Sequence, residues 1–321
     1  MGWIKTALVW AILATLESGA WELGKYGTRS FQRIGEGNVW VMHGPAVEPD
    51  RENGGFMNNP AFIEGKRGLI VIDPGANYNV GKKVLEEIEK VSKKPILAIL
   101  NTHKHGDHWF ANIALAERYP KVQIYAHPQM IKEVKEGEAK NWYGILDRLT
   151  KNMEGTKPFK YPFIEIRDGE KLSIDGEELL IFHPERTHTD TDLMIAHPAS
   201  GTFFVADNVM RNRLGTFDAS SSILGNIALL QKVKKETDYR YYVPGHGPSG
   251  SKSEVIDPYL SYLSTLAKWA QKAYDNDEEY YTVKKDALKE LEAYKGWDAF
   301  ERQMGKHLAK VYGEIEEKDM E

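Results

Sequence analysis

The octapeptide Asn101-Thr102-His103-Lys104-His105-Gly106-Asp107-His108 holds the densest group of metal-binding residue types in the chain. It follows the apolar run Ile96–Leu100, which predicts a buried strand. Three histidines and one aspartate therefore stand at the end of a rigid element, where several side chains can be directed at one point. Imidazole is the commonest protein nitrogen ligand for metals, and carboxylates supply oxygen ligands to zinc. The octapeptide predicts a metal site.

The residues upstream of the octapeptide predict an α/β arrangement. The run Leu69–Ile72 reads as a strand that ends sharply at Asp73-Pro74-Gly75. Apolar residues recur at helical spacing over Val80–Val91, and Pro95 separates this segment from the next strand. In such sheets, sites form beyond the carboxyl ends of the strands. Further ligands are therefore expected where other strands end.

Three more residues of ligand type follow predicted strands. His188 comes after the strand at 178–182, Asp207 ends the strand at 202–206, and His246 follows the strand at 241–243. The remaining histidines outside the octapeptide are interpreted as packed or exposed side chains, and Asp190 and Asp192 as turn caps beside His188. These histidines are His43, His127, His183, His197 and His307.

The amino-acid composition excludes several classes of protein and of metal site. The 321 residues are 41% hydrophobic and 28% charged, which is typical of a globular protein with a substantial core. A net charge of -5 argues against a nucleic-acid binder, which would carry a basic surface. The chain has no cysteine, which excludes disulfides, thiolate metal ligands and a cysteine nucleophile. A metal site must therefore use His, Asp, Glu and water.

The first 20 residues predict a secretory signal peptide. A short start with one lysine at position 5 precedes the apolar run 6–16, and the small residues Ser18, Gly19 and Ala20 follow. The run is shorter than the roughly 20 residues that a membrane span requires. We therefore expect a secreted or periplasmic protein without a membrane span in the mature chain. An uncleaved anchor or a packed N-terminal helix are the alternatives.

The rest of the chain divides into two parts by its pattern. Residues 21–255 contain the predicted strands and helices of a catalytic domain, and residues 256–321 predict a helical extension rich in Lys and Glu. Four apolar side chains of the extension are expected to pack on the core or to mediate a homodimer. These are Tyr259, Tyr262, Leu263 and Leu266.

Five motifs in this order resemble the metallo-β-lactamase-fold hydrolases, of the glyoxalase-II-like, HxHxDH type. They are Ile-Asp-Pro-Gly at 72–75, Thr-His-x-His-x-Asp-His at 102–108, His-Thr at 188–189, Ala-Asp-Asn at 206–208 and Pro-Gly-His-Gly at 244–247. The resemblance covers about Val39 to Pro248 and implies an αββα four-layer sandwich. It also implies that His103, His105 and His188 hold one metal ion, that Asp107, His108 and His246 hold a second, and that Asp207 bridges them.

Two zinc ions agree with the chemistry of this set of residues. Metal ions about 3.5–4 Å apart can share a hydroxide and polarise a substrate bond at neutral pH. Asp107 is the expected catalytic residue, since it would both ligate and orient that hydroxide. Asp73 is expected to accept a hydrogen bond from a ligand histidine. Iron is the alternative metal.

The resemblance leaves several functions open. The first is a hydrolase for ester-, thioester-, lactone- or lactam-type bonds of a small molecule. The second is an iron-dependent oxidoreductase like the persulfide dioxygenases, and the third is a cysteine-free β-lactamase, although that subclass usually lacks the bridging aspartate. A non-catalytic metal-binding protein is a further alternative. Several residues flank the site without a predicted role: Met57, Asn58, Trp109, Trp142, Tyr143, Arg211, Arg213 and Phe217.

Overall fold

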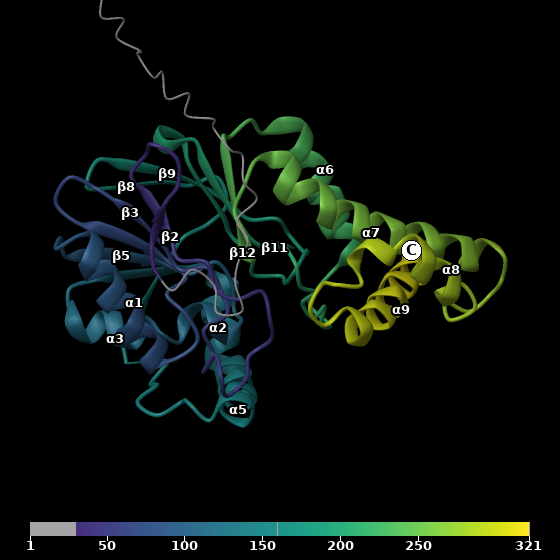
Figure 1. Ribbon diagram of the computed structural model, residues 1–321, viewed down its shortest axis with the longest axis horizontal. Coiled ribbons are helices and arrows are strands. Elements are labelled where there is room, and N and C mark those ends of the chain that lie inside the picture. Colours follow the sequence, from purple (N-terminus) through teal and green to yellow (C-terminus); the bar gives the residue numbers. More distant parts are fainter. Residues whose placement is uncertain (1–29, 159, 321) are drawn as a thin grey trace, which may run out of the picture.

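The computed structural model describes residues 30–158 and 160–320 (Figure 1). The segment expected to be a signal peptide, residues 1–20, lies outside these ranges. Within the described ranges, every helix is too short or too polar to cross a lipid bilayer. Two β-sheets with helices on their outer faces form the larger part of the molecule, and three C-terminal helices extend to one side of it (Figure 1).

The first sheet has seven strands that lie in chain order. Strands β1 to β4 pair antiparallel, and β4 to β7 pair parallel. All four residues of β4 are buried, as expected of a strand that is covered on both faces. The strands are β1 (Gln32–Arg33), β2 (Val39–Val41), β3 (Ala61–Glu64), β4 (Leu69–Ile72), β5 (Ile96–Leu100), β6 (Gln123–Ala126) and β7 (Phe163–Glu165).

The second sheet has five strands in the order β12-β11-β10-β9-β8. Only the pair of β11 and β12 is parallel within it. This pairing continues through two register shifts, so β11 and β12 extend beyond the predicted ends at 206 and 243. The strands are β8 (Lys171–Ile174), β9 (Glu177–Phe182), β10 (Met194–His197), β11 (Thr202–Met210) and β12 (Tyr241–His246).

The helices begin and end at recognisable signals. The side chain of Asn77 caps the first helix by accepting from the backbone N–H of Val80, and Ser222 caps the sixth in the same way. The helices are α1 (Tyr78–Val91), α2 (Gly106–Trp109), α3 (Asn112–Arg118), α4 (Pro128–Glu133), α5 (Ala139–Thr150), α6 (Ile223–Glu236), α7 (Lys252–Asp275), α8 (Lys284–Glu290) and α9 (Phe300–Asp319), with a π-helical turn at Val134–Glu138 and 3-10 turns at Pro198–Ser200 and Glu292–Tyr294.

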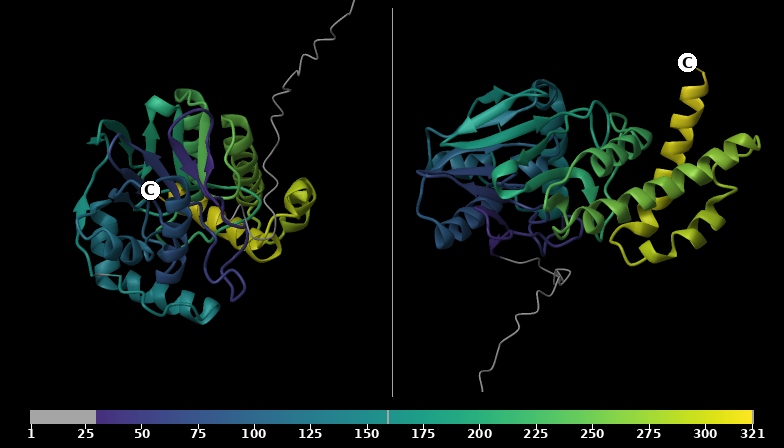
Figure 2. Two further views of the ribbon diagram at one scale, coloured as in Figure 1. Left: turned by 60° about the vertical axis from the view of Figure 1, so that its left-hand side comes forward. Right: turned by 90° about the horizontal axis from the view of Figure 1, so that it is seen from above.

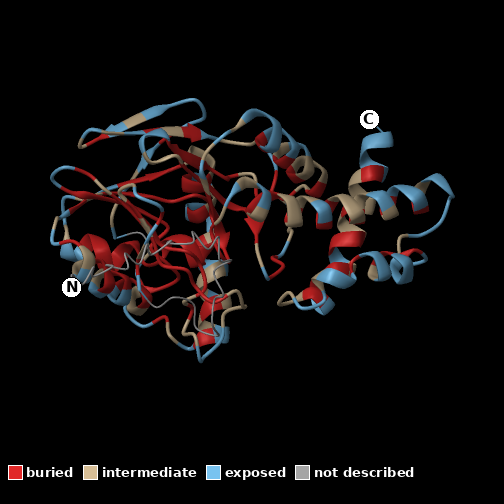
Figure 3. Cartoon of the chain, turned by 45° about the horizontal axis from the view of Figure 1, so that its top comes forward, coloured by how far each residue is buried: buried red, intermediate tan, exposed pale blue. Residues whose placement is uncertain are grey.

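Alternate side chains of the strands build a four-layer sandwich. Ile70 of the first sheet and Phe204 of the second belong to the apolar cluster between the sheets. Their neighbour Val71 faces outward onto α1 and α3, and Phe203 faces outward onto α6 and α7. Figure 2 shows the two sheets stacked between these helices, and Figure 3 shows that buried residues concentrate in the strands. The predicted αββα arrangement is confirmed.

One helix prediction near the octapeptide is wrong. The sequence of residues 109–118 predicts a single helix, but α2 already begins at Gly106 and ends before α3. The backbone explains the break, because the N–H of Ala111 bonds to the carbonyl of Gly75, and the N–H of Gly75 bonds to the carbonyl of His108. The sequence of residues 128–153 predicts a mostly helical segment with a break near Gly137, and this break is confirmed, since the glycine has φ 148° inside the π-helical turn.

The C-terminal helices pack against the body of the protein. Helix α7 starts at Lys252, before the predicted start of the helical extension at residue 256, because Ser251 and Glu254 form a capping box. The four apolar residues expected to pack, among them Tyr259 and Leu263, are fully buried with residues of α6, α9 and β11. The prediction that they contact the core is confirmed.

Helix α9 also contacts the loop that joins β11 to α6. Nε2 of His307 donates to the carbonyl of Gly215 at 2.9 Å. The carboxylate of Glu314 accepts from the backbone N–H groups of Ile223 and Leu224 at 3.0 and 2.9 Å, where α6 begins. A carboxylate at a helix N-terminus is favoured by unpaired N–H groups and the helix dipole. The extension therefore helps to hold residues 213–222 in place.

Candidate metal centre

The seven predicted ligands come from the ends of strands in both sheets. His103 and His105 follow β5, and α2 presents Asp107 and His108 one turn later. His188 lies in the loop after β9, while Asp207 lies in β11 and His246 ends β12. All seven side chains are buried.

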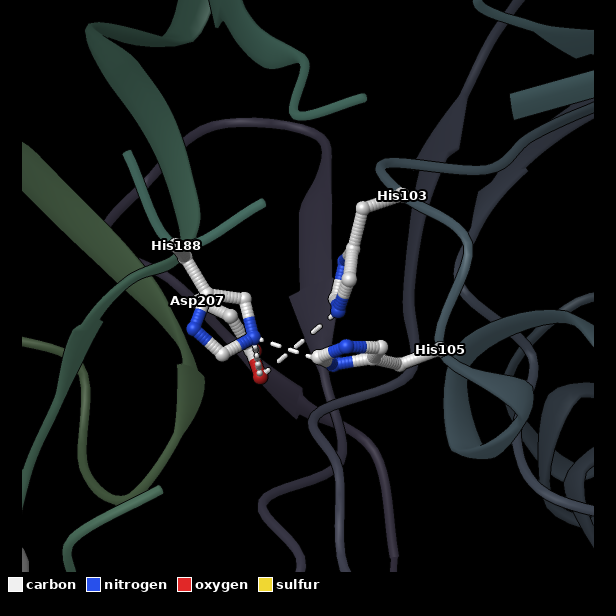
Figure 4. A group of neighbouring side chains, drawn as sticks. All are labelled: His103, His105, His188 and Asp207. Carbon is white, nitrogen blue, oxygen red and sulfur yellow. Dashed lines mark hydrogen bonds and ion pairs between the residues drawn. The ribbon is translucent and has the colours of Figure 1, made fainter. Parts of the chain in front are cut away.

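Four of these residues form the first ligand group, which consists of His103, His105, His188 and Asp207. Each offers one ligand atom, and these atoms all lie within 4.8 Å of one another. Nδ1 of His105 lies 3.0 Å from Nε2 of His188, and Oδ2 of Asp207 lies 3.4 Å from the same Nε2. Figure 4 shows the four side chains pointing toward one another.

The other three residues, Asp107, His108 and His246, form the second ligand group, again within 4.8 Å. Oδ2 of Asp107 lies 3.3 Å from Nε2 of His246. Asp207 also reaches this group, because its Oδ1 lies 3.3 Å from Nε2 of His108 and its Oδ2 lies 3.3 Å from Nε2 of His246. Asp207 therefore lies between the two groups.

Hydrogen bonds to the outer ring nitrogens fix which nitrogen faces the site. Nδ1 of His108 donates to Oδ2 of Asp73 at 2.9 Å, as expected for Asp73. The hydroxyl of Thr102 donates to the same carboxylate, so it accepts from Nδ1 of His103 at 3.0 Å. Nδ1 of His246 donates to the carbonyl of Met57 at 2.8 Å. In the neutral form of each of these three rings, the Nε2 atom therefore carries the lone pair that faces the site.

The ligand atoms lack partners that a metal ion would provide. Nε2 of His103 and Oδ1 of Asp207 are fully buried and make no hydrogen bond among the described residues. Buried polar atoms without partners are costly. Nε2 of His108 faces Nε2 of His246 at 3.3 Å, and when both rings are neutral these two lone pairs cannot satisfy each other. This set of donors fits divalent cations such as zinc.

The electrostatics of the buried side chains also favour a bound cation. Burial holds the pKa of His103 well below its usual range and lowers that of His188 to about 3. Burial opposes ionisation of Asp107 and Asp207, but the histidines beside them hold both pKa values well below the usual range. Burial also opposes protonation of His108, yet the carboxylates around it hold its pKa well above the usual range.

The backbone at the site has unusual φ values and one unusually close contact. Asp73 and Ala206 have φ values of 47° and 50°, which non-glycine residues adopt infrequently. Asp73 supplies the carboxylate for His108, and Ala206 directly precedes Asp207. Gly245 packs so closely on Asp207 that a Cβ atom there would overlap Oδ1 of the carboxylate. The Pro-Gly-His motif therefore needs glycine for steric reasons.

Two polar residues near the ligands were missed in the sequence. Lys104, between the first two histidines, is buried and bonds to Glu133 and Asp190. Oδ2 of Asp218 lies 3.8 Å from Nε2 of His105, which is an electrostatic contact rather than a hydrogen bond. The position of Lys104 inside the octapeptide was the only signal for it. Asp218 had none, because it lies on a loop outside every motif.

The two aspartates beside His188, Asp190 and Asp192, have different partners. Asp192 accepts bonds from the backbone N–H of Thr189 and the hydroxyl of Thr187, so its predicted role as a turn cap is confirmed. Asp190 has a different principal partner, since its Oδ1 pairs with Nζ of Lys104 at 2.9 Å. A cation buried in the neighbouring loop attracts this carboxylate more strongly than a backbone N–H does.

Aromatic side chains lie against the first ligand group. The ring of Trp142 is 4.6 Å from that of His105, and the ring of Phe217 is 6.2 Å from that of His188. The other flanking residues support the scaffold. Their bonds are Asn58 Nδ2 to Asp73 O, Trp109 Nε1 to Lys104 O, Tyr143 OH to Met153 O, Arg211 Nη1 to Pro248 O and Arg213 Nη1 to Val47 O, besides the carbonyl of Met57 described above.

The five histidines predicted not to be ligands belong to neither ligand group. His43, His197 and His307 are buried and hydrogen-bonded, with Ser249, Glu177 and the Gly215 carbonyl as partners. The rings of His127 and His183 stack with centroids 3.9 Å apart. The structural interpretation of these five residues is confirmed.

Comparisons with known proteins agree with this geometry. A probable metallo-hydrolase of Methanocaldococcus jannaschii is 27% identical over 208 residues, covering 62% of this chain and 91% of that protein. A metallo-beta-lactamase type 2 of a Bacillus species, strain 170, is 22% identical over 241 residues, covering 72% of this chain and 80% of that protein.

A solved structure extends the likeness to the C-terminal helices. The stereoselective inverting sec-alkylsulfatase of a Pseudomonas species matches with a TM-score of 0.66 and 16% identity, over 89% of this chain and 50% of that chain. At this identity the likeness concerns the fold. The family described as the metallo-beta-lactamase superfamily matches residues 53–248, which is more than half of the chain. The chain therefore belongs to the metallo-beta-lactamase superfamily and is a metal-dependent hydrolase.

Proposed function

We propose that the chain is an exported dinuclear zinc hydrolase that cleaves an ester-, thioester-, lactone- or lactam-type bond of a small molecule. One observation carries this proposal: two buried ligand groups lie side by side, and Asp207 contacts histidines of both. In the proposed site His103, His105 and His188 hold one zinc ion, Asp107, His108 and His246 hold the other, and Asp207 bridges them.

The side chains around the proposed ions have distinct tasks. When bound, zinc supplies Lewis acidity that polarises the scissile bond and makes water nucleophilic near neutral pH. Asp107 is the proposed catalytic residue, because its buried carboxylate is ionised at neutral pH and can orient the attacking water. Asp73 and Thr102 hold the rings of His108 and His103 so that Nε2 of each faces the site.

Zinc and export rest on separate arguments. Five imidazoles and two carboxylates without any thiolate are a donor set that zinc accepts, and zinc suits hydrolysis since it has no redox chemistry. Export is supported by the order of charged, apolar and small residues over 1–20.

An activity panel tests the proposed function. Zinc-loaded and iron-loaded protein would be assayed on lactam, lactone, thioester, phosphoester and sulfate ester substrates. We expect zinc-dependent hydrolysis of one carboxylic acid derivative, lowered about a hundredfold or more in an Asp107→Ala variant. Oxygen uptake on a persulfide by iron-loaded protein alone would contradict the proposal, and so would full activity of the variant on every substrate.

A further inference from the structure

Lys104 connects three loops that surround His105. Its side chain is only 6% exposed, and Nζ donates to Oε2 of Glu133 at 2.6 Å, to Oδ1 of Asp190 at 2.9 Å and to Oγ of Ser220 at 2.9 Å. The three donors of the ammonium group are thereby used. Glu133 ends α4, Asp190 follows His188, and Ser220 lies just before α6. A single cation thus joins segments that are distant in sequence.

Ser220 extends this network to Asp218. Oγ of Ser220 accepts from Lys104, so its own proton is donated to Oδ1 of Asp218 at 2.6 Å. The backbone N–H of Ser220 donates to the same oxygen at 2.7 Å. These two bonds hold Oδ1, and they leave Oδ2 of Asp218 directed at Nε2 of His105 at 3.8 Å.

The His105 ring is held between this carboxylate and an aromatic side chain. Nδ1 of His105 faces the first ligand group, and Nε2 faces Asp218. Trp142 lies against the ring with centroids 4.6 Å apart. A carboxylate near the outer nitrogen of a ligand histidine favours the tautomer with its proton there, and leaves the inner nitrogen free to bind metal.

We propose that Lys104 is a positioning residue that acts on His105 through Ser220 and Asp218. Lys104 fixes the loop of Asp218, and Asp218 fixes the orientation and the tautomer of His105. The inference rests on the proposed function, because it assigns His105 as a ligand of the first metal ion. The affinity of the first ligand group for its metal ion then depends on Lys104, which itself touches no metal ion.

The network makes a selective prediction. Groups that orient metal ligands typically contribute ten- to a hundredfold in metal affinity. We expect Asp218→Asn to weaken metal binding at the first ligand group by about that factor, and Lys104→Met and Ser220→Ala by about tenfold. The second ligand group should be nearly unchanged, since Asp73 and the Met57 carbonyl fix its histidines independently.

Cobalt(II) titration of the full chain tests this inference. Dissociation constants for the two ligand groups would come from visible absorption in competition with a chelator, for the wild type, the three single variants and the Lys104→Met, Asp218→Asn double variant. Lys94→Met is the matched control, because Nζ of Lys94 also bonds to a carboxylate oxygen, that of Glu64 at 3.1 Å, but at the opposite end of β5 from the octapeptide. Ser220→Ala keeps every charge, so it reports on the network even where Lys104→Met folds poorly.

The double variant distinguishes positioning from a general loss of packing. If Lys104 acts through Asp218, the double variant should bind cobalt no more weakly than Asp218→Asn alone. Losses that multiply in the double variant, or a first ligand group unaffected by Ser220→Ala and Asp218→Asn, would overturn the inference and leave the proposed function intact. A wild-type chain that binds no cobalt would overturn both.

Discussion

Nδ1 of His108 lies 2.9 Å from Oδ2 of Asp73, a residue 35 positions earlier at the end of the neighbouring strand. The same carboxylate accepts from the backbone N–H of Thr102 at 2.9 Å and from its hydroxyl at 2.6 Å. One side chain therefore joins β4 to the octapeptide and selects the nitrogen with which His108 faces the second ligand group. Asp73 makes these bonds from a backbone conformation with a positive φ of 47°.

Replacing Asp73 by asparagine should weaken metal binding at the second ligand group. Asparagine tolerates a positive φ, so the backbone should be preserved while the negative charge beside His108 is lost. We expect metal affinity to fall ten- to a hundredfold, measured by chelator competition.

Asp175→Asn is the matched control for Asp73→Asn. Asp175 also has a positive φ, at 53°, and its carboxylate also accepts backbone N–H bonds, but from the turn at Arg67 and Gly68. Equal losses of metal affinity in the two variants would contradict the assigned role of Asp73.

A methyl group at Gly245 should disrupt the centre with little effect elsewhere. The Cβ atom of a Gly245→Ala variant would overlap Oδ1 of Asp207, and this carboxylate contacts both ligand groups. We expect loss of at least one bound metal ion and of most activity. Gly313→Ala in α9 is the control, because outside its own stretch of helix no atom of the described residues lies within 4 Å of the Cβ position, and it should stabilise the protein by about 0.5–1 kcal/mol. Full metal content in Gly245→Ala would exclude the proposed position of Asp207.

Binding of metal ions should release protons at neutral pH. The carboxylates around His108 raise its pKa well above 6.5, so this ring is protonated in the metal-free protein at pH 7. Asp107 and Asp207 are already ionised and release none. Calorimetric titration with zinc in buffers of different ionisation enthalpy should show at least one proton released per chain, from His108, besides any proton lost by metal-bound water. A binding heat that does not depend on the buffer would contradict this protonation state.

The contact between α9 and the loop at Gly215 should make the protein sensitive to acid. Burial lowers the pKa of His307 to about 4, whereas an unfolded histidine titrates near 6.5. Between these values the unfolded chain binds a proton that the folded chain does not. The free energy of unfolding should therefore fall by about 3 kcal/mol from this group as the pH drops from 6.5 to 4.

Urea denaturation at several pH values measures this loss. His307→Gln can still donate to Gly215 and accept from Tyr262, so it should flatten the pH dependence while remaining folded. Part of the dependence should persist, because burial also lowers the pKa of His43 to about 4. An identical pH slope in the wild type and the variant would rule out His307 as a source of the acid sensitivity.

The sequence could predict those features that strand ends dictate. His103, His188 and Asp207 each follow or end an apolar run, and α/β sheets bring such ends together, so their proximity could be foreseen. The helix over 109–118 could not be placed correctly, because its division depends on bonds to Gly75, which is distant in sequence. Lys104 and Asp218 were unassigned for the same reason, since their partners lie in other loops.

Metal stoichiometry tests the central claim most directly. The chain would be purified without added metal, equilibrated with zinc and then analysed for metal content by elemental mass spectrometry. We expect two zinc ions per wild-type chain and one per chain in a His246→Ala variant, in which the second ligand group lacks a ligand. A wild-type chain that holds only one metal ion, or that retains iron and excludes zinc, would contradict a dinuclear zinc hydrolase.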